Sequence, residues 1–547
     1  MRRISKPVLL ATLLYFAVGC DPEGLYEYQI NVRDQVELLS GLALLEGDPG
    51  RVVFLEVAES SVRVRQPLTA NEGERISWLT GGPNRDAPSQ LFAMTVPVDE
   101  RETGIDRAFL RVDPSTGTID RFLTGSEFGG LAFAPGWRFA LLYHLSSDGG
   151  ESGALFNPNE IAVVDLNEPP SQDNPQILSV DIGGRTITGI DFVETLEVDG
   201  EIRSLAVFYA EGMVKLLDLL DLSIPAIAIM LTADDDPREV EPTQVIARAG
   251  DETRDPTLFV RARYSQDIYA ISLVPRPDGL PGFWASLNQF DGGTEPSDLL
   301  LIDDGEVPLL MVANWYGSET NVINIDTADT FSLHLENTAQ YSLLRGETGA
   351  REVVLYGGST DRVHFVAVDG LIEEQDSNLD DLLIPDGVNQ ASVLDADRLL
   401  ITPANSSDLL VLDLATRDII RLTAPGGYDW QDAEIFGSLF FAANPGSDRV
   451  VSLDLTTGHP QSLVLDEPVS SFHTFDAAGM GLVVHRRCPD VSHNNRVHRG
   501  GSPDARRLHG RGRLEAGARP QRHPDRAAGH RVRGCLERRP RHHPRRR

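Results

Sequence analysis

The stretch from Asn444 to Gly458 reads NPGSDRVVSLDLTTG: a small-polar loop, an apolar strand, an aspartate and a turn. The same order of residues recurs in ANSSDLLVLDLAT (Ala404 to Thr416) and in ANWYGSETNVINIDT (Ala313 to Thr327). Short runs of Val, Leu and Ile that are bounded by polar turn residues are typical of β-strands. The chain is therefore interpreted as an array of similar β units.

One residue, which we call the marker, ends the apolar strand in each unit. The markers lie 41 to 54 residues apart, at Asp113, Asp165, Asp218, Ser272, Asp326, Asp369, Asp413 and Asp454, and a segment from Arg51 fits the same pattern. An aspartate at a strand end can accept hydrogen bonds from the backbone N–H groups of the turn. Every unit needs a turn, whereas a catalytic group is needed once, so the recurrence favours a structural role.

A repeat of about 40 to 55 residues with several strands per unit fits the blade of a β-propeller. One four-stranded sheet cannot bury both of its faces, but neighbouring blades packed against it can. The predicted fold is all-β: a seven- or eight-bladed β-propeller of four-stranded antiparallel blades over residues 46–485, with a pair of β-sandwiches as the alternative. One short helix is expected, in EEQDSNLDDLL from Glu373 to Leu383.

The units LLITPANSSDLLVLDLAT (Leu399 to Thr416) and VINIDTA (Val322 to Ala328) resemble the repeat of the YVTN-type, lactonase-like propellers. Looser copies are LFVRARYSQDIYAISL (Leu258 to Leu273) and LFFAANPGSDRVVSLDLTTG (Leu439 to Gly458). The resemblance covers about residues 250–458 well and residues 50–250 weakly. It implies blade architecture and no particular activity, because the repeated residues build strands and turns.

The first residues have the pattern of an export signal. Arg2, Arg3 and Lys6 precede the apolar run PVLLATLLYFAV, which is too short to span a bilayer as a mature helix. The run ends in AVGC, which resembles the bacterial lipobox. The resemblance implies cleavage after Gly19, a diacylglycerol thioether at Cys20 and an acylated N-terminus; an ordinary signal peptide with a chance cysteine is the alternative. Asp21 follows the cysteine. In some Gram-negative bacteria an aspartate at this position retains the lipoprotein at the inner membrane, and the choice between inner and outer membrane stays open.

The predicted domains are a signal peptide (1–19), a lipidated tether (20–45), the propeller (46–485) and an Arg-rich tail (486–547). The tail holds 19 arginines against five acidic residues, a net charge of +14, so the total of -33 leaves -47 on residues 1–485. Such a body repels nucleic acid and anionic headgroups. We predict a monomer anchored to the membrane through Cys20, with no nucleic-acid partner.

The tail has no Ile, Phe, Tyr, Trp or Met, and it holds the other two cysteines, Cys488 and Cys535. Its composition changes abruptly after GLVVH, in what reads as the middle of a blade. A frameshift in a GC-rich gene produces such Arg-, Pro- and His-rich sequence, and we favour it over a basic arm. A one-base shift near codon 486 that restores a β-rich blade would verify this prediction. The body itself has no cysteine, so its core must hold the fold without disulfides.

No sequence motif identifies a catalytic site. The body has six histidines without metal-ligand spacing: His144, His334, His364, His459, His473 and His485. We expect His334 and His364 to be partly exposed or satisfied strand residues, and His473 is the candidate for facing a propeller channel.

A calcium loop is the other candidate site. Asp376, Asn378 and Asp380 alternate as calcium ligands do, but Gly387 stands where the final glutamate belongs, so a solvated acidic loop is favoured. Nucleophile-elbow, phosphate-loop, dinucleotide and zinc motifs are absent from the sequence. We predict no metal and no cofactor.

The leading hypothesis is a lipoprotein whose propeller is a binding or scaffolding platform at the bacterial cell envelope, contacting proteins or glycans through its blade loops. The alternative is a propeller enzyme, a lactonase-like hydrolase or an envelope oxidoreductase, with its site at the channel mouth.

Overall fold

The computed structural model divides into two compact units, residues 1–486 and 487–547. All described residues belong to the first unit. They are residues 32–485 except 39–40, 47–49, 59–60, 65–67, 83–89, 100–105, 146–156, 183–184, 199, 233–239, 251–253, 277–281, 304–306, 348–349, 369–370, 372–378, 407, 423–431, 437, 444–448, 465–468 and 476–479. The predicted signal peptide, Cys20 and the Arg-rich tail therefore lie outside the described residues.

The described residues form β-strands almost throughout. The first three sheets contain β1 (Val32–Leu38), β2 (Gly41–Glu46), β3 (Arg51–Ala58), β4 (Ser61–Val64) and β5 (Leu68–Thr69); β6 (Glu74–Gly81), β7 (Leu91–Pro97), β8 (Ala108–Asp113) and β9 (Thr118–Leu123); and β10 (Gly130–Phe133), β11 (Phe139–Tyr143), β12 (Glu160–Asp165) and β13 (Gln176–Ser179). A single 3-10 turn, η1 (Pro135–Trp137), is the only helical element in this part of the chain.

The next three sheets each have four strands. They contain β14 (Gly189–Val198), β15 (Glu201–Ala210), β16 (Met213–Asp218) and β17 (Ile227–Met230); β18 (Glu241–Arg248), β19 (Thr257–Arg263), β20 (Asp267–Pro275) and β21 (Phe283–Asp291); and β22 (Pro296–Ile302), β23 (Leu309–Asn314), β24 (Glu319–Asn324) and β25 (Thr330–His334).

The last sheets include one of seven strands. The strands are β26 (Tyr341–Arg345), β27 (Glu352–Tyr356), β28 (Thr360–Ala367), β29 (Leu379–Asp395), β30 (Arg398–Pro403), β31 (Leu409–Asp413) and β32 (Ile419–Leu422); β33 (Asp432–Phe436), β34 (Leu439–Ala443), β35 (Arg449–Asp454) and β36 (His459–Val464); and β37 (Val469–Phe475) with β38 (Met480–His485). The seven-stranded sheet is two four-stranded units that share the long strand β29, whose first half pairs with β28 and second half with β30.

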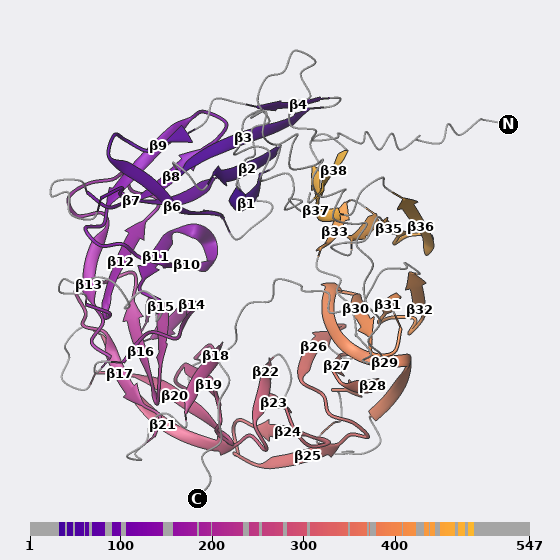
Figure 1. The fold of residues 1–547 in the computed structure, drawn as a ribbon. Helices are drawn as coiled ribbons and strands as arrows, with labels where there is room; N and C mark the ends of the chain where they lie inside the picture. Colours follow the sequence, from indigo (N-terminus) through magenta and orange to yellow (C-terminus); the bar gives the residue numbers. More distant parts are fainter. Residues whose placement is uncertain are drawn as a thin grey trace, which may run out of the picture. The chain divides into compact units, whose positions relative to one another are not determined.

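Each unit is an antiparallel meander in which consecutive strands are neighbours. Between β6 and β36 the described residues hold eight such four-stranded units. Six of the predicted markers lie in the third strand of a unit: Asp113, Asp165, Asp218, Ser272, Asp413 and Asp454. The β1–β5 sheet, whose third strand is β3, precedes them, and the β37–β38 hairpin follows. Figure 1 shows the sheets following one another in chain order.

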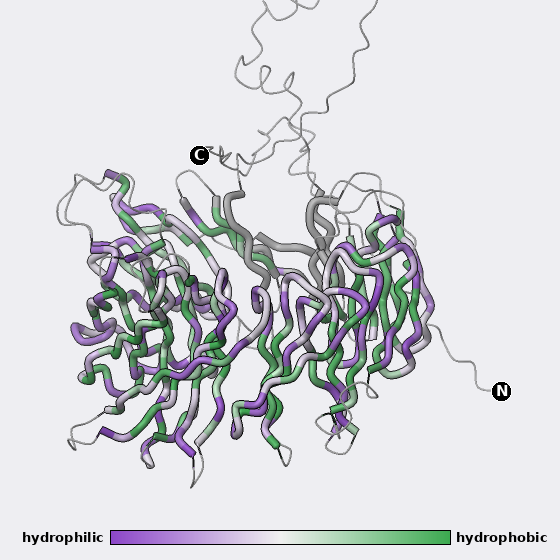
Figure 2. Tube along the Cα trace, turned by 90° about the horizontal axis from the view of Figure 1, so that it is seen from below, coloured by the Kyte–Doolittle hydropathy of each residue, from purple (hydrophilic) through white to green (hydrophobic). Residues whose placement is uncertain are grey.

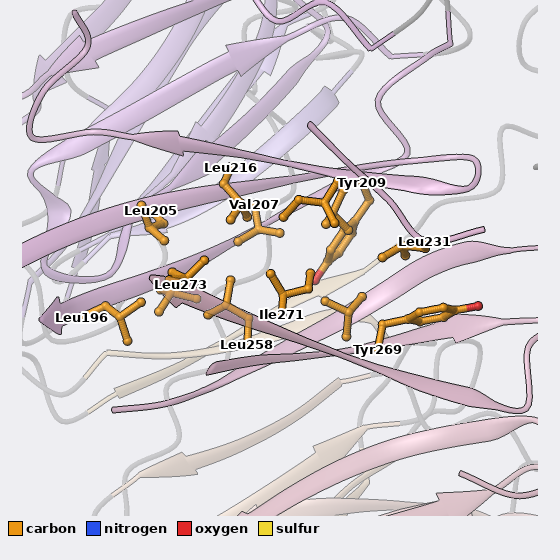
Figure 3. Close-up of a cluster of buried hydrophobic side chains, with 14 of the residues drawn as sticks. Leu196, Leu205, Val207, Tyr209, Leu216, Leu231, Leu258, Tyr269, Ile271 and Leu273 are labelled. Carbon is orange, nitrogen blue, oxygen red and sulfur yellow. The ribbon is translucent and has the colours of Figure 1, made fainter. Parts of the chain in front are cut away.

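Each pair of consecutive units, from β1–β5 to β33–β36, encloses one hydrophobic core, the two halves of the seven-stranded sheet counting as separate units. The eight buried clusters fall one to each interface, because each draws residues from two adjacent units. In Figure 3, Leu205 and Val207 of β15 meet Leu258 of β19 and Ile271 of β20. Figure 2 shows the apolar residues running along the strands. Sheets that bury both faces against their neighbours are the blades of a β-propeller, so the predicted fold class is confirmed.

Five markers bind their turns as predicted. The Oδ1 atoms of Asp165 and Asp218 each accept the backbone N–H two residues ahead. The Oδ1 atoms of Asp113, Asp413 and Asp454 each accept hydrogen bonds from the backbone N–H groups two and three residues ahead. In the same turns, the fourth residue after the marker has a positive φ and donates its N–H to the marker carbonyl; these residues are Gly117, Arg417 and Gly458. A positive φ favours glycine, which fills two of the three positions.

The marker assignment is wrong in two units. In β24 the turn is held by Asn324, whose Oδ1 accepts the N–H groups of Asp326 and Thr327, while Asp326 pairs instead with Arg248 and Arg254 of the preceding sheet. Ser272 lies inside β20, which continues to Pro275, so it ends no strand. Asp369 lies outside the described residues.

The residue after the marker joins neighbouring units in three places. Its carbonyl accepts a hydrogen bond from an arginine of the preceding unit, with the pairs Arg111 to Leu166, Arg345 to Leu414 and Arg398 to Leu455. The marker position therefore supports both the turn and the contact between blades.

Two further expectations differ from the structure. The residues of the expected helix that are described, from Leu379 to Leu383, begin strand β29, because their backbone pairs with β28 and pairing overrides weak local preference. The predicted tether, residues 20–45, contains β1 and most of β2, so the first sheet begins within it at Val32.

Replacing Asp113 by alanine is expected to reduce stability above about pH 4 and to have little effect in acid. The hydrogen bond from the Ser115 hydroxyl, with help from Thr116 and the turn N–H groups, lowers the pKa of Asp113, although burial opposes this. A lowered pKa adds stability that is present above the unfolded-state pKa and is lost as the pH falls through the folded-state pKa. Urea unfolding midpoints from pH 2 to 7 measure the difference, with Glu127→Ala as the control. A pH-independent difference would contradict the prediction.

Candidate functional site

The antiparallel meander gives each sheet two edges with different residues. At one edge the third strands end in the markers, and we call it the marker edge. At the other edge the second and fourth strands end and the first and third begin, and we call it the aromatic edge. The Trp315 to Ser318 loop and the start of β26 at Tyr341 belong to it.

The marker edge holds a cavity of about 510 Å³ between the β10–β13 and β14–β17 sheets. Arg138, Asp165, Asn174 and Asp221 are among its lining residues. Asp165 accepts the N–H of Asn167 and pairs with Arg138 at 3.1 Å, while Asp221 accepts the N–H and the hydroxyl of Ser223. Asp165 and Asp221 therefore stabilise turns, and the other two lining carboxylates, Glu168 and Asp173, are solvent-exposed surface groups.

A row of polar side chains crosses the first strands of four consecutive sheets near the aromatic edge. It consists of Asp191 (β14), Gln244 (β18), Asp298 (β22) and Ser342 (β26), all partly buried. Asp191 Oδ2 accepts the N–H of Val245 at 3.2 Å, and Gln244 Nε2 donates to Asp298 Oδ1 at 3.0 Å. Asp298 Oδ2 accepts both the N–H and the hydroxyl of Ser342 at 2.8 Å. The row therefore links each blade to the next.

Arg261 and Tyr209 join this row. Arg261 donates from Nε to Gln244 Oε1 at 3.0 Å and from Nη1 to the Pro296 carbonyl at 3.1 Å, and the Tyr209 hydroxyl donates to Asp191. Burial raises the pKa of Tyr209, and Asp191 raises it further. Burial lowers the pKa of Arg261, and Asp298 opposes this. Two carboxylates and one guanidinium thus share a partly dry environment.

Three aromatic rings cover one end of the polar row. The centroids of Trp315 and Tyr341 lie 6.3 Å apart with the rings nearly perpendicular, and those of Tyr341 and Tyr356 lie 5.6 Å apart. Trp315 is 37% exposed and Tyr341 38%, whereas Tyr356 is buried. Burial, with Asp298 and Tyr341 as smaller contributions, raises the pKa of Tyr356 to about 12. The neighbouring Tyr316 is 63% exposed.

The histidines identified in the sequence lie in or next to several different sheets of the structure. His334 is exposed and lies 3.2 Å from Glu319, as expected of a strand residue. The fully buried His364 is also a strand residue, and its Nδ1 lies 2.6 Å from Asp381, but its Nε2 has no hydrogen-bond partner among the described residues. His144 is buried against the Phe128 ring, and His459 is exposed. His473 and His485 fall in β37 and β38, and their side chains are outside the description.

Of the predicted calcium loop only its end is described. Asp376 and Asn378 lie outside the described residues, and Asp380 belongs to β29, where it pairs with Arg417. Across the described ranges, no three His, Cys, Asp or Glu residues gather as metal ligands would. In the same ranges, no helix has the length and apolar character needed to cross a bilayer.

Sequence inspection did not find the polar row or the aromatic cluster. A signal was present: a polar residue precedes the apolar run in GIDFV, PTQVI, PSDLL and YSLLR, the first strands of four units. Aligning the units on their first strands, rather than on the markers, would have shown it.

No protein-family model and no curated protein matches the sequence. Among solved structures, the chain is similar to the dihydro-heme d1 dehydrogenase NirN in complex with DHE, with 14% identity over 68% of this chain and 76% of that one and a TM-score of 0.39. It is also similar to the WD40 domain of SCAP from fission yeast (11% identity, 62% and 87% of the two chains, TM-score 0.36) and to apo AztD from Citrobacter koseri (12% identity, 66% and 92%, TM-score 0.31). Identities this low carry no information about the chemistry of this chain.

Proposed function

We propose that the protein is an exported bacterial lipoprotein, anchored through Cys20, whose YVTN-like propeller binds a partner at the cell envelope through its aromatic edge. The contrast between the two edges supports this proposal. At the marker edge Asp165, Asp413 and Asp454 are engaged in turns or ion pairs, whereas the aromatic edge exposes Tyr264, Trp315, Tyr316 and Tyr341. Exposed tryptophan and tyrosine are the residues that most often dominate binding interfaces.

Binding fits the chemistry of this edge better than catalysis. Asp191, Gln244, Asp298 and Ser342 are occupied by one another and by backbone groups, and the bond from the Ser342 N–H to Asp298 holds the backbone next to Tyr341. Rigid rings lose little conformational entropy when a partner covers them.

A photo-crosslinking experiment tests the binding site. The photoreactive amino acid p-benzoylphenylalanine is placed at Tyr316 on the aromatic edge or, as the matched control, at Thr456 in an exposed marker turn. Irradiated cells are expected to give a discrete adduct from position 316 and none from position 456. Equal labelling at both positions, or none at position 316, would refute the platform.

Replacing Cys20 by serine tests the anchor. The loss of two or three acyl chains removes the affinity for the membrane, since stable anchoring needs more than one chain. We expect the wild-type chain in the membrane fraction of the host and nearly all of the Cys20→Ser chain in the soluble fraction, measured by immunoblot. Unchanged partition of the variant would rule out lipidation at Cys20.

A further inference from the structure

The aromatic edge of the β18–β21, β22–β25 and β26–β29 units is unusually acidic for a surface that exposes large rings. Its segments are residues 261–267, 291–298, 314–319, 334–342 and 356–361, all of them described. They contain seven carboxylates and two arginines, and Arg362, directly after the last segment, pairs with Glu336 at 2.6 Å. The net charge with Arg362 included is -4: Asp267, Asp291, Glu295, Asp298, Glu319, Glu336 and Asp361 against Arg261, Arg263 and Arg362. The local field therefore has the same sign as that of the whole body.

Two of these carboxylates stand directly opposite each other. Asp267 begins β20 and is the register partner of Asp291, which ends β21. Like charges at opposite positions of an antiparallel pair are destabilising. Burial raises the pKa of Asp267, and the charge of Asp291 raises it further. The Asp267–Asp291 pair thus adds to the negative electrostatic potential at this edge, and a bound cation would reduce the repulsion between the two carboxylates.

The rings have the arrangement that attracts cations. Trp315 and Tyr341 meet at 73°, so they form two walls of a corner, and the 32° tilt between Tyr341 and Tyr356 continues it inward. The face of an aromatic ring is negative, and tryptophan attracts cations most strongly. Walls of this kind enclose ammonium and guanidinium groups.

Resting on the proposed binding function, we infer that the partner is a cationic protein segment, with a lysine or arginine side chain seated against Trp315 and Tyr341. Charge complementarity brings such a segment to the aromatic edge, because a field of one sign steers oppositely charged partners. The rings then distinguish this site from the rest of the acidic surface, where attraction is unspecific and screened by salt.

Fluorescence anisotropy with a labelled nonapeptide of alternating lysine and serine tests the inference at physiological salt. We expect Trp315→Ala and Tyr341→Ala each to weaken binding about tenfold. The control Trp284→Ala removes a tryptophan that is 51% exposed in β21, outside the five segments, and should leave the affinity unchanged. Tyr316→Ser, at a 63% exposed position, keeps the test valid if a ring variant fails to fold.

Three outcomes would overturn the inference. One is equal binding of the corresponding glutamate–serine peptide. Another is an affinity of Trp315→Ala that is as little changed as that of Trp284→Ala, which would mean attraction by bulk charge alone. The third is displacement of the basic peptide by maltoheptaose, which would indicate a glycan site. A crosslinked adduct at position 316 together with no binding of the basic peptide would support the proposed binding function and reject only the inference that the partner is cationic.

Discussion

Replacing Asp218 by alanine is expected to lower the free energy of unfolding by about 3–5 kcal/mol. Asp218 Oδ2 lies 2.7 Å from Arg203 Nη1, and the two side chains are 1% and 8% exposed. The variant leaves the guanidinium buried without its buried carboxylate partner, which costs far more than losing a surface ion pair. It also removes the acceptor of the hydrogen bond from the Leu220 N–H to Asp218 Oδ1, which is 3.0 Å long and stabilises the turn.

Chemical denaturation of the purified chain measures this effect. The matched control is Glu201→Ala, which removes the other carboxylate beside Arg203 but one that is 68% exposed, so a loss of about 1 kcal/mol or less is expected. The double variant Arg203→Met with Asp218→Leu should recover most of the stability, since an apolar pair of similar size needs no counter-charge. A single Asp218→Ala variant as stable as Glu201→Ala would show that the pair is not essential to the blade.

Replacing Asp298 by alanine is expected to cost about 3 kcal/mol. The change removes the acceptor of three hydrogen bonds, from Gln244 and twice from Ser342, and the carboxylate that offsets the buried charge of Arg261. Because Asp298 and these partners together come from three consecutive units, the loss should loosen contacts between blades as well as one strand. Asp298→Asn, which keeps an acceptor but no charge, should lie between the alanine variant and the wild type.

A spectroscopic readout separates this role from general destabilisation. Asp298 contributes to the raised pKa of Tyr356, after burial, so both Asp298 variants should lower that pKa from about 12. An alkaline titration of tyrosinate absorbance in the folded protein measures the change. An unaltered titration in Asp298→Ala would show that the carboxylate does not act on the aromatic cluster.

The turn at Asn324 shows that the spacing of residues along the chain does not identify which side chain stabilises a turn. Asn324 and Asp326 are two residues apart in VINIDT, and both side chains can accept a hydrogen bond. Spacing favoured Asp326, but the backbone places the N–H of Ala328 on the carbonyl of Asn324, so Asn324 holds the turn. Asp326 is then free to pair with arginines of the preceding sheet, a contact that spacing cannot reveal.

The start of β29 shows the same limit for secondary structure. Leu379 to Leu383 has few β-branched residues and many carboxylates, a composition that favours a helix over a strand. Its backbone nevertheless pairs with Val363 and Val366 of β28. Pairing with a strand already in place supplies hydrogen bonds and burial that local preference does not include.

The sequence by itself determined the repeat, its all-β character, the acidic body and the apolar faces that neighbouring blades cover, because period and composition are local properties of the chain. Only the tertiary structure decided which side chains meet. Asp191, Gln244, Asp298 and Ser342 come from four units spread over more than a hundred residues, and each is an unremarkable polar residue within its own strand. They form one row because packing the sheets brings their first strands side by side, and the same packing places Trp315 of one blade against Tyr341 of the next.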